Sequence, residues 1–151
     1  MQDNLDDALA CITAAPLAGA HNYLLMDKHG RGCNVEAMAT RHDVQWLDDA
    51  PITHTNHCLI AHNHAVERYR PPESLASSQK RLQRANHLLA RRNLTPDDLM
   101  ALTRDPEAIC VRSAPPYHIE SCGAAVMRPA TGDFWAVWGL PSENDYEHFR
   151  I

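Results

Sequence analysis

The sequence predicts an α+β fold in which antiparallel β-hairpins flank a pair of helices. Short apolar segments of strand length, joined by turns that contain glycine, occur near both ends of the chain. The middle of the chain instead carries apolar residues at helical spacing. The chain has 151 residues, of which 44% are hydrophobic and 22% charged, as in a folded globular protein. We therefore expect one domain over residues 1–151, in which residues 1–19 form a helix and linker.

The first predicted elements are a helix and a hairpin. Residues 4–14 predict a short helix with Asn4 or Asp3 as N-cap, because apolar residues recur on one face. Residues 22–39 predict a β-hairpin, because two apolar segments flank a turn at 28–32 that contains two glycines. Residues 44–47 and 53–61 predict two further strands.

The second half of the chain predicts two helices and three strands. Ser74 can cap an amphipathic helix that runs to about Arg92. Thr95 followed by Pro96 and two acids predicts the start of a short helix that ends near Arg104. Residues 108–112, 121–128 and 134–140 predict strands, and the tight connection at 130–133 makes the last two a hairpin.

Charge and hydropathy exclude some classes of partner. A net charge of −5 and a pI near 6.0 argue against nucleic-acid binding, for which domains are usually basic. No apolar segment approaches the roughly 20 residues that a membrane span needs, and the N-terminal residues are acidic where a secretory signal is basic. We expect a cytoplasmic protein that binds neither nucleic acid nor membrane.

The cysteines are odd in number and widely spaced, which argues against a disulfide framework or a zinc ribbon. Two interpretations stay open for them: small buried hydrophobes, or a reactive nucleophile. The five residues are Cys11, Cys33, Cys58, Cys110 and Cys122.

Four histidines, His54, His57, His62 and His64, lie within eleven positions. Imidazoles this close together could bind zinc, copper or nickel. On a strand, however, His54 and His57 would point to opposite faces, and Glu67 is the only acid nearby. We expect hydrogen-bonded histidines and neither a metal nor another cofactor, with a metal site as the alternative.

Three short motifs follow one another in the first half of the chain. They are Asn22-Tyr23-Leu24 with Asp27, Val35-Glu36-Ala37, and His54-Thr55-Asn56-His57. Together they resemble the acyl-CoA:6-aminopenicillanic acid acyltransferase family, the C45 peptidases, and more distantly the choloylglycine hydrolases and penicillin V acylases. The helix start at residues 77–85 (SSQKRLQRA) and, more weakly, residues 139–142 extend the resemblance over most of residues 20–142. All these families are N-terminal-nucleophile hydrolases with an αββα sandwich.

The resemblance implies a cysteine nucleophile that self-cleavage exposes as a new N-terminus and whose own α-amino group acts as the base. The resemblance also implies that the substrates are small molecules with amide or acyl thioester bonds. Attack on these builds an oxyanion, which needs preorganised hydrogen-bond donors. By resemblance Asn56 supplies such a donor through its side-chain amide. Arg81 by resemblance lies beside the nucleophile and sets the charge of the site, a task that suits an always-charged guanidinium.

Departures from the family pattern suggest that this chain corresponds to only the C-terminal part of such an enzyme. The one cysteine upstream of the motifs, Cys11, falls in a predicted helix, and Lys80 stands where relatives have a serine. We expect the nucleophile to be absent from this chain, which is then inactive alone. Either a complementary chain carries it, or the chain forms a homo-oligomer. The alternative is a catalytically inactive binding or oligomerisation module of the same fold.

Overall fold

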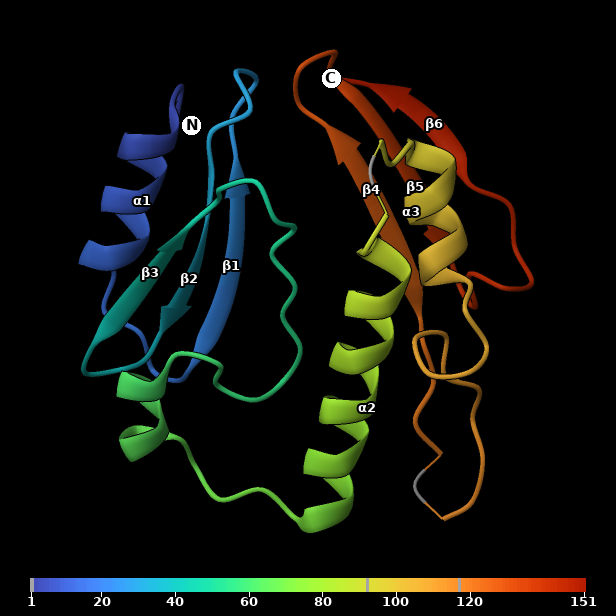
Figure 1. Cartoon of the computed structure of the whole chain (residues 1–151), viewed down its shortest axis with the longest axis horizontal. Coiled ribbons are helices and arrows are strands. Elements are labelled where there is room, and N and C mark those ends of the chain that lie inside the picture. The colour runs from blue at the N-terminus through green and yellow to red at the C-terminus, as the bar shows by residue number, and fades with distance from the viewer. Residues whose placement is uncertain (1, 92, 117) are drawn as a thin grey trace. The chain divides into compact units, whose positions relative to one another are not determined.

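The computed structural model describes residues 2–91, 93–116 and 118–151 and confirms the α+β class. Its helices and strands form two compact units, residues 1–79 and residues 80–151. Each unit contains one antiparallel three-stranded sheet, with the orders β1-β2-β3 and β4-β5-β6 (Figure 1). The expectation of a single domain stays a prediction.

The first unit begins with the predicted helix, α1 (Leu5–Ala14). Asn4 caps it, since its side chain accepts a hydrogen bond from the backbone N–H of Asp7 at 2.8 Å. Helix α1 lies along one face of the first sheet (Figure 1), and its apolar side packs on that face. The apolar contacts join Leu5, Leu9 and Ile12 of α1 to Cys33, Val35 and Ala37 of the sheet. Burial of this side holds the short helix in place.

The first sheet contains β1 (His21–Met26), β2 (Gly32–Ala37) and β3 (His42–Trp46). The predicted hairpin is confirmed: β1 pairs antiparallel with β2, and Gly30 adopts the positive φ of +83° that the turn requires. Every residue of the central strand β2 is buried. Because side chains alternate along a strand, Asn34 and Glu36 lie on the face opposite the apolar residues.

The strand predicted over residues 53–61 is wrong. These residues form a loop that leads into a 3₁₀ helix, η1 (Ala61–Val66), which was not predicted. In a β-strand the backbone N–H groups donate hydrogen bonds to a neighbouring strand, whereas in this segment they donate to side chains. Asn56 N donates to Ser78 Oγ at 2.9 Å, and Cys58 N donates to Glu67 Oε1 at 3.0 Å. The N–H groups of Leu59 and Ile60 donate to the Glu36 carboxylate.

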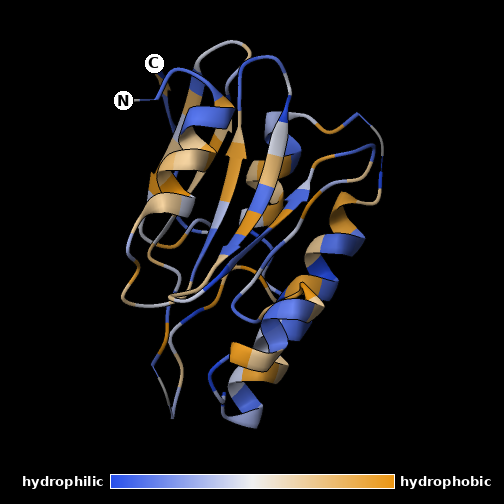
Figure 2. Cartoon of the chain, turned by 90° about the vertical axis from the view of Figure 1, so that its left-hand side faces the viewer, coloured by the Kyte–Doolittle hydropathy of each residue, from blue (hydrophilic) through white to orange (hydrophobic). Residues whose placement is uncertain are grey.

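The long helix α2 (Pro72–Leu89) begins two residues before the predicted Ser74. Proline is favoured in the first turn of a helix, where its missing N–H has no partner to lose. The predicted end, Arg92, lies outside the described residues. Hydrophilic and hydrophobic positions alternate along α2, as expected for an amphipathic helix (Figure 2). None of the helices in the described residues combines the length and apolarity needed to cross a bilayer.

The second unit confirms the other predicted helix and the C-terminal hairpin. Helix α3 (Pro96–Thr103) starts with a capping box, in which Thr95 and Asp98 bond each other's backbone N–H groups. Strands β4 (Gly123–Arg128) and β5 (Asp133–Trp138) pair antiparallel, as predicted. A third strand, β6 (Glu147–Arg150), pairs with β5 and was not predicted.

The strand predicted over residues 108–112 is also wrong, because these residues form turns and irregular backbone. Asp105 accepts the backbone N–H groups of Ala108 at 3.0 Å and Ile109 at 3.4 Å. The Arg84 guanidinium from α2 holds the same carboxylate, with Nε 2.9 Å from Oδ1. A local side chain therefore takes the donors that a strand would use.

Candidate functional site

The third motif of the sequence lies in the loop of residues 54–60, called here the 54–60 loop. It connects β3 to η1 in the first unit and contains His54, Asn56 and His57. The loop has no strand partner, so its conformation depends on side chains that bond it from elsewhere in the unit. Two such side chains anchor it: Glu36 of β2 and Ser78 of α2.

Glu36 binds both ends of the loop. Its side chain is only 2% exposed, and its Oε1 lies 3.0 Å from His54 Nε2 and accepts the backbone N–H of Leu59 at 2.5 Å. The Ile60 N–H lies 3.3 Å from both carboxylate oxygens, and Asn63 Nδ2 donates to Oε2 at 3.0 Å. A buried carboxylate is thus surrounded by donors.

Two opposing effects set the pKa of Glu36. Burial raises it, and the donors from Leu59, Asn63, His54 and Ile60 lower it. The donors outweigh burial, so the pKa lies below the ordinary glutamate value. Glu36 is therefore ionised near neutral pH, and the His54 Nε2 facing it acts as a donor.

Ser78 binds the middle of the loop. It is fully buried in α2, and its Oγ accepts the Asn56 N–H at 2.9 Å and lies 2.8 Å from His57 Nδ1. The hydroxyls of Ser78 and Thr55 are 3.0 Å apart, and Thr55 Oγ1 donates to the Ser78 carbonyl at 3.1 Å. Burial lowers the pKa of His57, which keeps this imidazole neutral in the network.

These bonds connect the sequence motifs physically. Glu36 comes from the second motif, His54 and His57 from the third, and Ser78 from the helix start. The exposed Asn56 lies between the two anchored histidines, and its own N–H is held by Ser78. The backbone of Asn56 is therefore fixed by contacts on both sides of it.

The second predicted site residue, Arg81, lies in α2 three residues after Ser78 and belongs to the second unit. It is half-buried, and burial lowers the pKa of its guanidinium. The prediction that Asn56 and Arg81 converge on one ligand stays a prediction.

The neighbouring histidines each have a different partner. His62 Nδ1 lies 3.0 Å from Asp43 Oδ2, and His64 Nε2 lies 3.2 Å from the Cys58 carbonyl. Among the described residues, no group of three or more metal-binding side chains is arranged to hold an ion. His54 and His57 do not alternate between two faces as predicted for a strand, because no strand forms there.

The cysteines are all free thiols, and the interpretation as buried hydrophobes is confirmed for Cys33, Cys58 and Cys110. Burial raises the pKa of Cys33, and it raises the pKa of Cys58 to about 11 with help from the nearby Glu67. Thiols with a raised pKa are poor nucleophiles at neutral pH. Cys11 and Cys122 are exposed.

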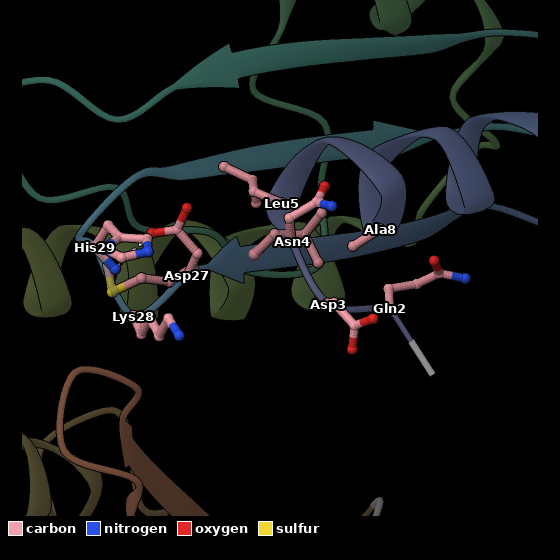
Figure 3. A pocket seen from close by; sticks show the side chains of 10 residues that line it. Gln2, Asp3, Asn4, Leu5, Ala8, Asp27, Lys28 and His29 are labelled. Atoms are coloured by element: carbon pink, nitrogen blue, oxygen red, sulfur yellow. Dashed lines mark hydrogen bonds between the residues drawn. The ribbon is translucent and has the colours of Figure 1, made fainter.

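A shallow pocket lies elsewhere in the first unit, between the N-terminus of α1 and the β1–β2 turn (Figure 3). Asp27 is the motif residue that lines it, and its Oδ1 already accepts the backbone N–H groups of His29 at 2.8 Å and Arg31 at 3.0 Å. Asp27 therefore shapes the hairpin turn, and the pocket contains no residue of the 54–60 loop.

Sequence reasoning assigned no role to Glu36 or Ser78, although both lie in the motifs. One signal was available for Glu36: it is an acid in the middle of a strand in which every residue is buried, and such an acid needs donors. Ser78 gave no such signal, because serine is common near helix starts.

Comparison with known proteins supports the resemblance. The family model for acyl-coenzyme A:6-aminopenicillanic acid acyl-transferase matches residues 2–142, which is nearly the whole chain. No curated protein and no solved structure matches the chain significantly. Hydrogen bonds in the first unit join residues of the second motif, the third motif and the helix start that carry the resemblance. The chain belongs to the acyl-coenzyme A:6-aminopenicillanic acid acyl-transferase family.

Proposed function

We propose that this chain provides the oxyanion-binding part of a cysteine N-terminal-nucleophile enzyme that transfers or hydrolyses acyl groups of amides or acyl thioesters. Membership of the acyl-transferase family supports this reaction class. The observation that carries the proposal is the 54–60 loop, which Glu36 and Ser78 hold on both sides of Asn56.

Asn56 is the proposed oxyanion donor. When a thiolate attacks the acyl carbonyl, negative charge develops on the carbonyl oxygen, and the Asn56 side-chain amide donates a hydrogen bond to it. A donor on a loop that is already fixed needs little rearrangement as the charge develops. Such a donor contributes about 2.7–4 kcal/mol of transition-state stabilisation in well-characterised enzymes.

Arg81 is the proposed positive charge of the site. A guanidinium keeps its charge even when burial lowers its pKa, so Arg81 can favour the thiolate form of a nearby cysteine or bind an anionic substrate group.

The nucleophile is proposed to be a cysteine outside this chain, carried by a complementary chain. An N-terminal nucleophile needs a free α-amino group as its base. Cys11 lies within α1, and Cys33, Cys58 and Cys110 are buried. Cys122 precedes β4 in mid-chain. Alone, the chain should then release no acyl group from acyl-CoA or acyl amides.

The test is made in the complete enzyme, which is this chain together with the chain that carries the nucleophile. It compares Asn56→Ala with the control Gln45→Ala, because Gln45 is an exposed amide of β3 in the same unit. Asn56→Ala should lower kcat by about 10²–10³-fold, and Gln45→Ala should leave it near the wild-type value. Equal activities of the two variants would refute the role of Asn56. A burst of acyl release by the isolated chain that Cys11→Ala abolishes would instead make Cys11 the nucleophile.

A second candidate is an inactive module that self-associates. Three apolar side chains of the second sheet, Met127, Trp138 and Phe149, lie on one face and are exposed, Trp138 by 91%. Exposed apolar surface of this kind is typical of interaction sites. A homodimer formed through this face should dissociate in Trp138→Glu, which light scattering detects. A wild-type monomer at micromolar concentration would contradict this candidate.

A further inference from the structure

We propose that Glu36 is a positioning residue of the acyl-transfer site, whose carboxylate holds the 54–60 loop in the conformation that presents Asn56. This inference rests on the proposed role of Asn56. It concerns a group that touches neither substrate nor nucleophile and acts through the loop.

The groups that surround the Glu36 carboxylate act as hydrogen-bond donors. His54 Nε2, the N–H groups of Leu59 and Ile60, and Asn63 Nδ2 all lie within hydrogen-bond distance of its two oxygens. An ionised carboxylate only accepts hydrogen bonds, so it satisfies all these groups together. A glutamine of the same shape would turn one oxygen into an NH₂ group and place it against donors. The site therefore requires the charge as well as the shape of glutamate.

The positions of these donors explain why one carboxylate controls the loop. His54 precedes Asn56, whereas Leu59 and Ile60 follow it. Glu36 thus fixes both ends of the segment, and Ser78 fixes the Asn56 N–H between them. Without the carboxylate, the Leu59 and Ile60 N–H groups lose their acceptors, and the ends of the loop are free to move.

The effect on catalysis should fall on the chemical step. The oxyanion is absent from the bound substrate and develops only as the thiolate attacks, so a displaced Asn56 weakens binding of the transition state and leaves ground-state binding of the substrate unchanged. A misplacement of about 1 Å can cost about 10²-fold in rate. Loss of Glu36 should therefore lower kcat at constant KM.

The fold should survive the change. Glu36 lies on the sheet face opposite the apolar core that Val35 and Cys33 form with α1. Glu36→Asp keeps an acceptor-only carboxylate but shortens it by one methylene, so it should retain part of the function. Asp43→Asn is the matched control, because Asp43 is an acid opposite Glu36 in β3 whose partner, His62, lies outside the 54–60 loop.

The experiment measures two quantities in the complete enzyme: amide hydrogen exchange at Leu59 and Ile60, and kcat and KM for an acyl-CoA substrate. Glu36→Gln should speed exchange at both amides by up to about tenfold, because its one remaining oxygen is a neutral acceptor and binds N–H groups about half as strongly as a carboxylate does. It should also lower kcat by about 10–100-fold at constant KM. Glu36→Asp should fall between wild type and Glu36→Gln, and Asp43→Asn should match wild type.

Unchanged exchange at Leu59 and Ile60 in Glu36→Gln would overturn the proposal whatever the activity. A loss confined to KM, or an equal loss in Asp43→Asn, would overturn it as well. A wild-type enzyme without acyl transfer would instead refute the proposed function. The two failures are therefore distinguishable, because the exchange measurement needs no turnover.

Discussion

Replacement of Ser78 by alanine tests how much the anchored loop contributes to stability. The serine Oγ accepts the Asn56 N–H at 2.9 Å and lies 2.8 Å from His57 Nδ1 and 3.0 Å from Thr55 Oγ1. Each of these contacts joins a residue of the 54–60 loop to a helix position with no exposed surface. Water therefore has little access to replace the missing hydroxyl.

The magnitude follows from these contacts. Three lost hydrogen bonds at about 1 kcal/mol each give about 3 kcal/mol. The better helix propensity of alanine offsets about 0.5 kcal/mol of this. Ser78→Ala should thus lower the free energy of unfolding by about 2.5 kcal/mol.

The assay is urea unfolding of Ser78→Ala and of Ser77→Ala, which removes an exposed hydroxyl one residue earlier in the same helix. Ser77→Ala should be neutral or slightly stabilising. If both variants unfold at the same urea concentration, the Ser78 network does not hold the loop and the reasoning fails.

Two further outcomes follow from pKa shifts. The donors around Glu36 lower its pKa, so its contribution to stability is complete above its unfolded pKa and disappears as pH falls through the folded pKa. The difference in unfolding free energy between wild type and Glu36→Gln, measured by urea titration, should therefore shrink as the pH is lowered below about 5. A difference that stays constant with pH would contradict this. The Cys58 pKa is raised to about 11, so iodoacetamide at pH 8 should modify Cys11 and Cys122 in the folded chain and reach Cys58 only on unfolding, as mass spectrometry would show.

The elements that the sequence predicted correctly depend on local signals. Asn4 caps α1, Thr95 and Asp98 form a capping box, and Gly30 adopts the positive φ of its turn. In each case the residues that decide the structure lie within a few positions of one another, so their pattern is visible in the sequence.

In the two segments that were wrongly predicted as strands, backbone N–H groups donate hydrogen bonds to side chains. Leu59 bonds Glu36, which is 23 positions away in the sequence, and apolar periodicity carries no sign of that contact. Ala108 bonds Asp105 only three residues earlier, yet Asp105 is fixed by Arg84, 21 positions away. Strand β6 was missed because all its residues are exposed, which leaves no alternating apolar pattern.

The candidate site was predicted in part. The motifs pointed to Asn56 and Arg81 through a family resemblance, and the family is confirmed. The anchoring roles of Glu36 and Ser78 were not predicted, because they depend on contacts that only the fold creates. The roles of Asn56 and Arg81 therefore stay predictions, whereas the contacts of Glu36 and Ser78 with the 54–60 loop became visible only in the fold.

The most direct test of the central claim compares two inhibitors of the complete enzyme, an aldehyde analogue of the acyl group and the primary alcohol of the same carbon chain. Attack of the cysteine on the aldehyde gives a tetrahedral adduct whose oxygen occupies the oxyanion position, whereas the alcohol has no carbonyl to attack and binds without forming an adduct. If the Asn56 side chain is the oxyanion donor, Asn56→Ala should weaken binding of the aldehyde by about 10²-fold or more and leave binding of the alcohol unchanged. Equal affinity of wild type and Asn56→Ala for the aldehyde, or an equal loss for both inhibitors, would contradict the account.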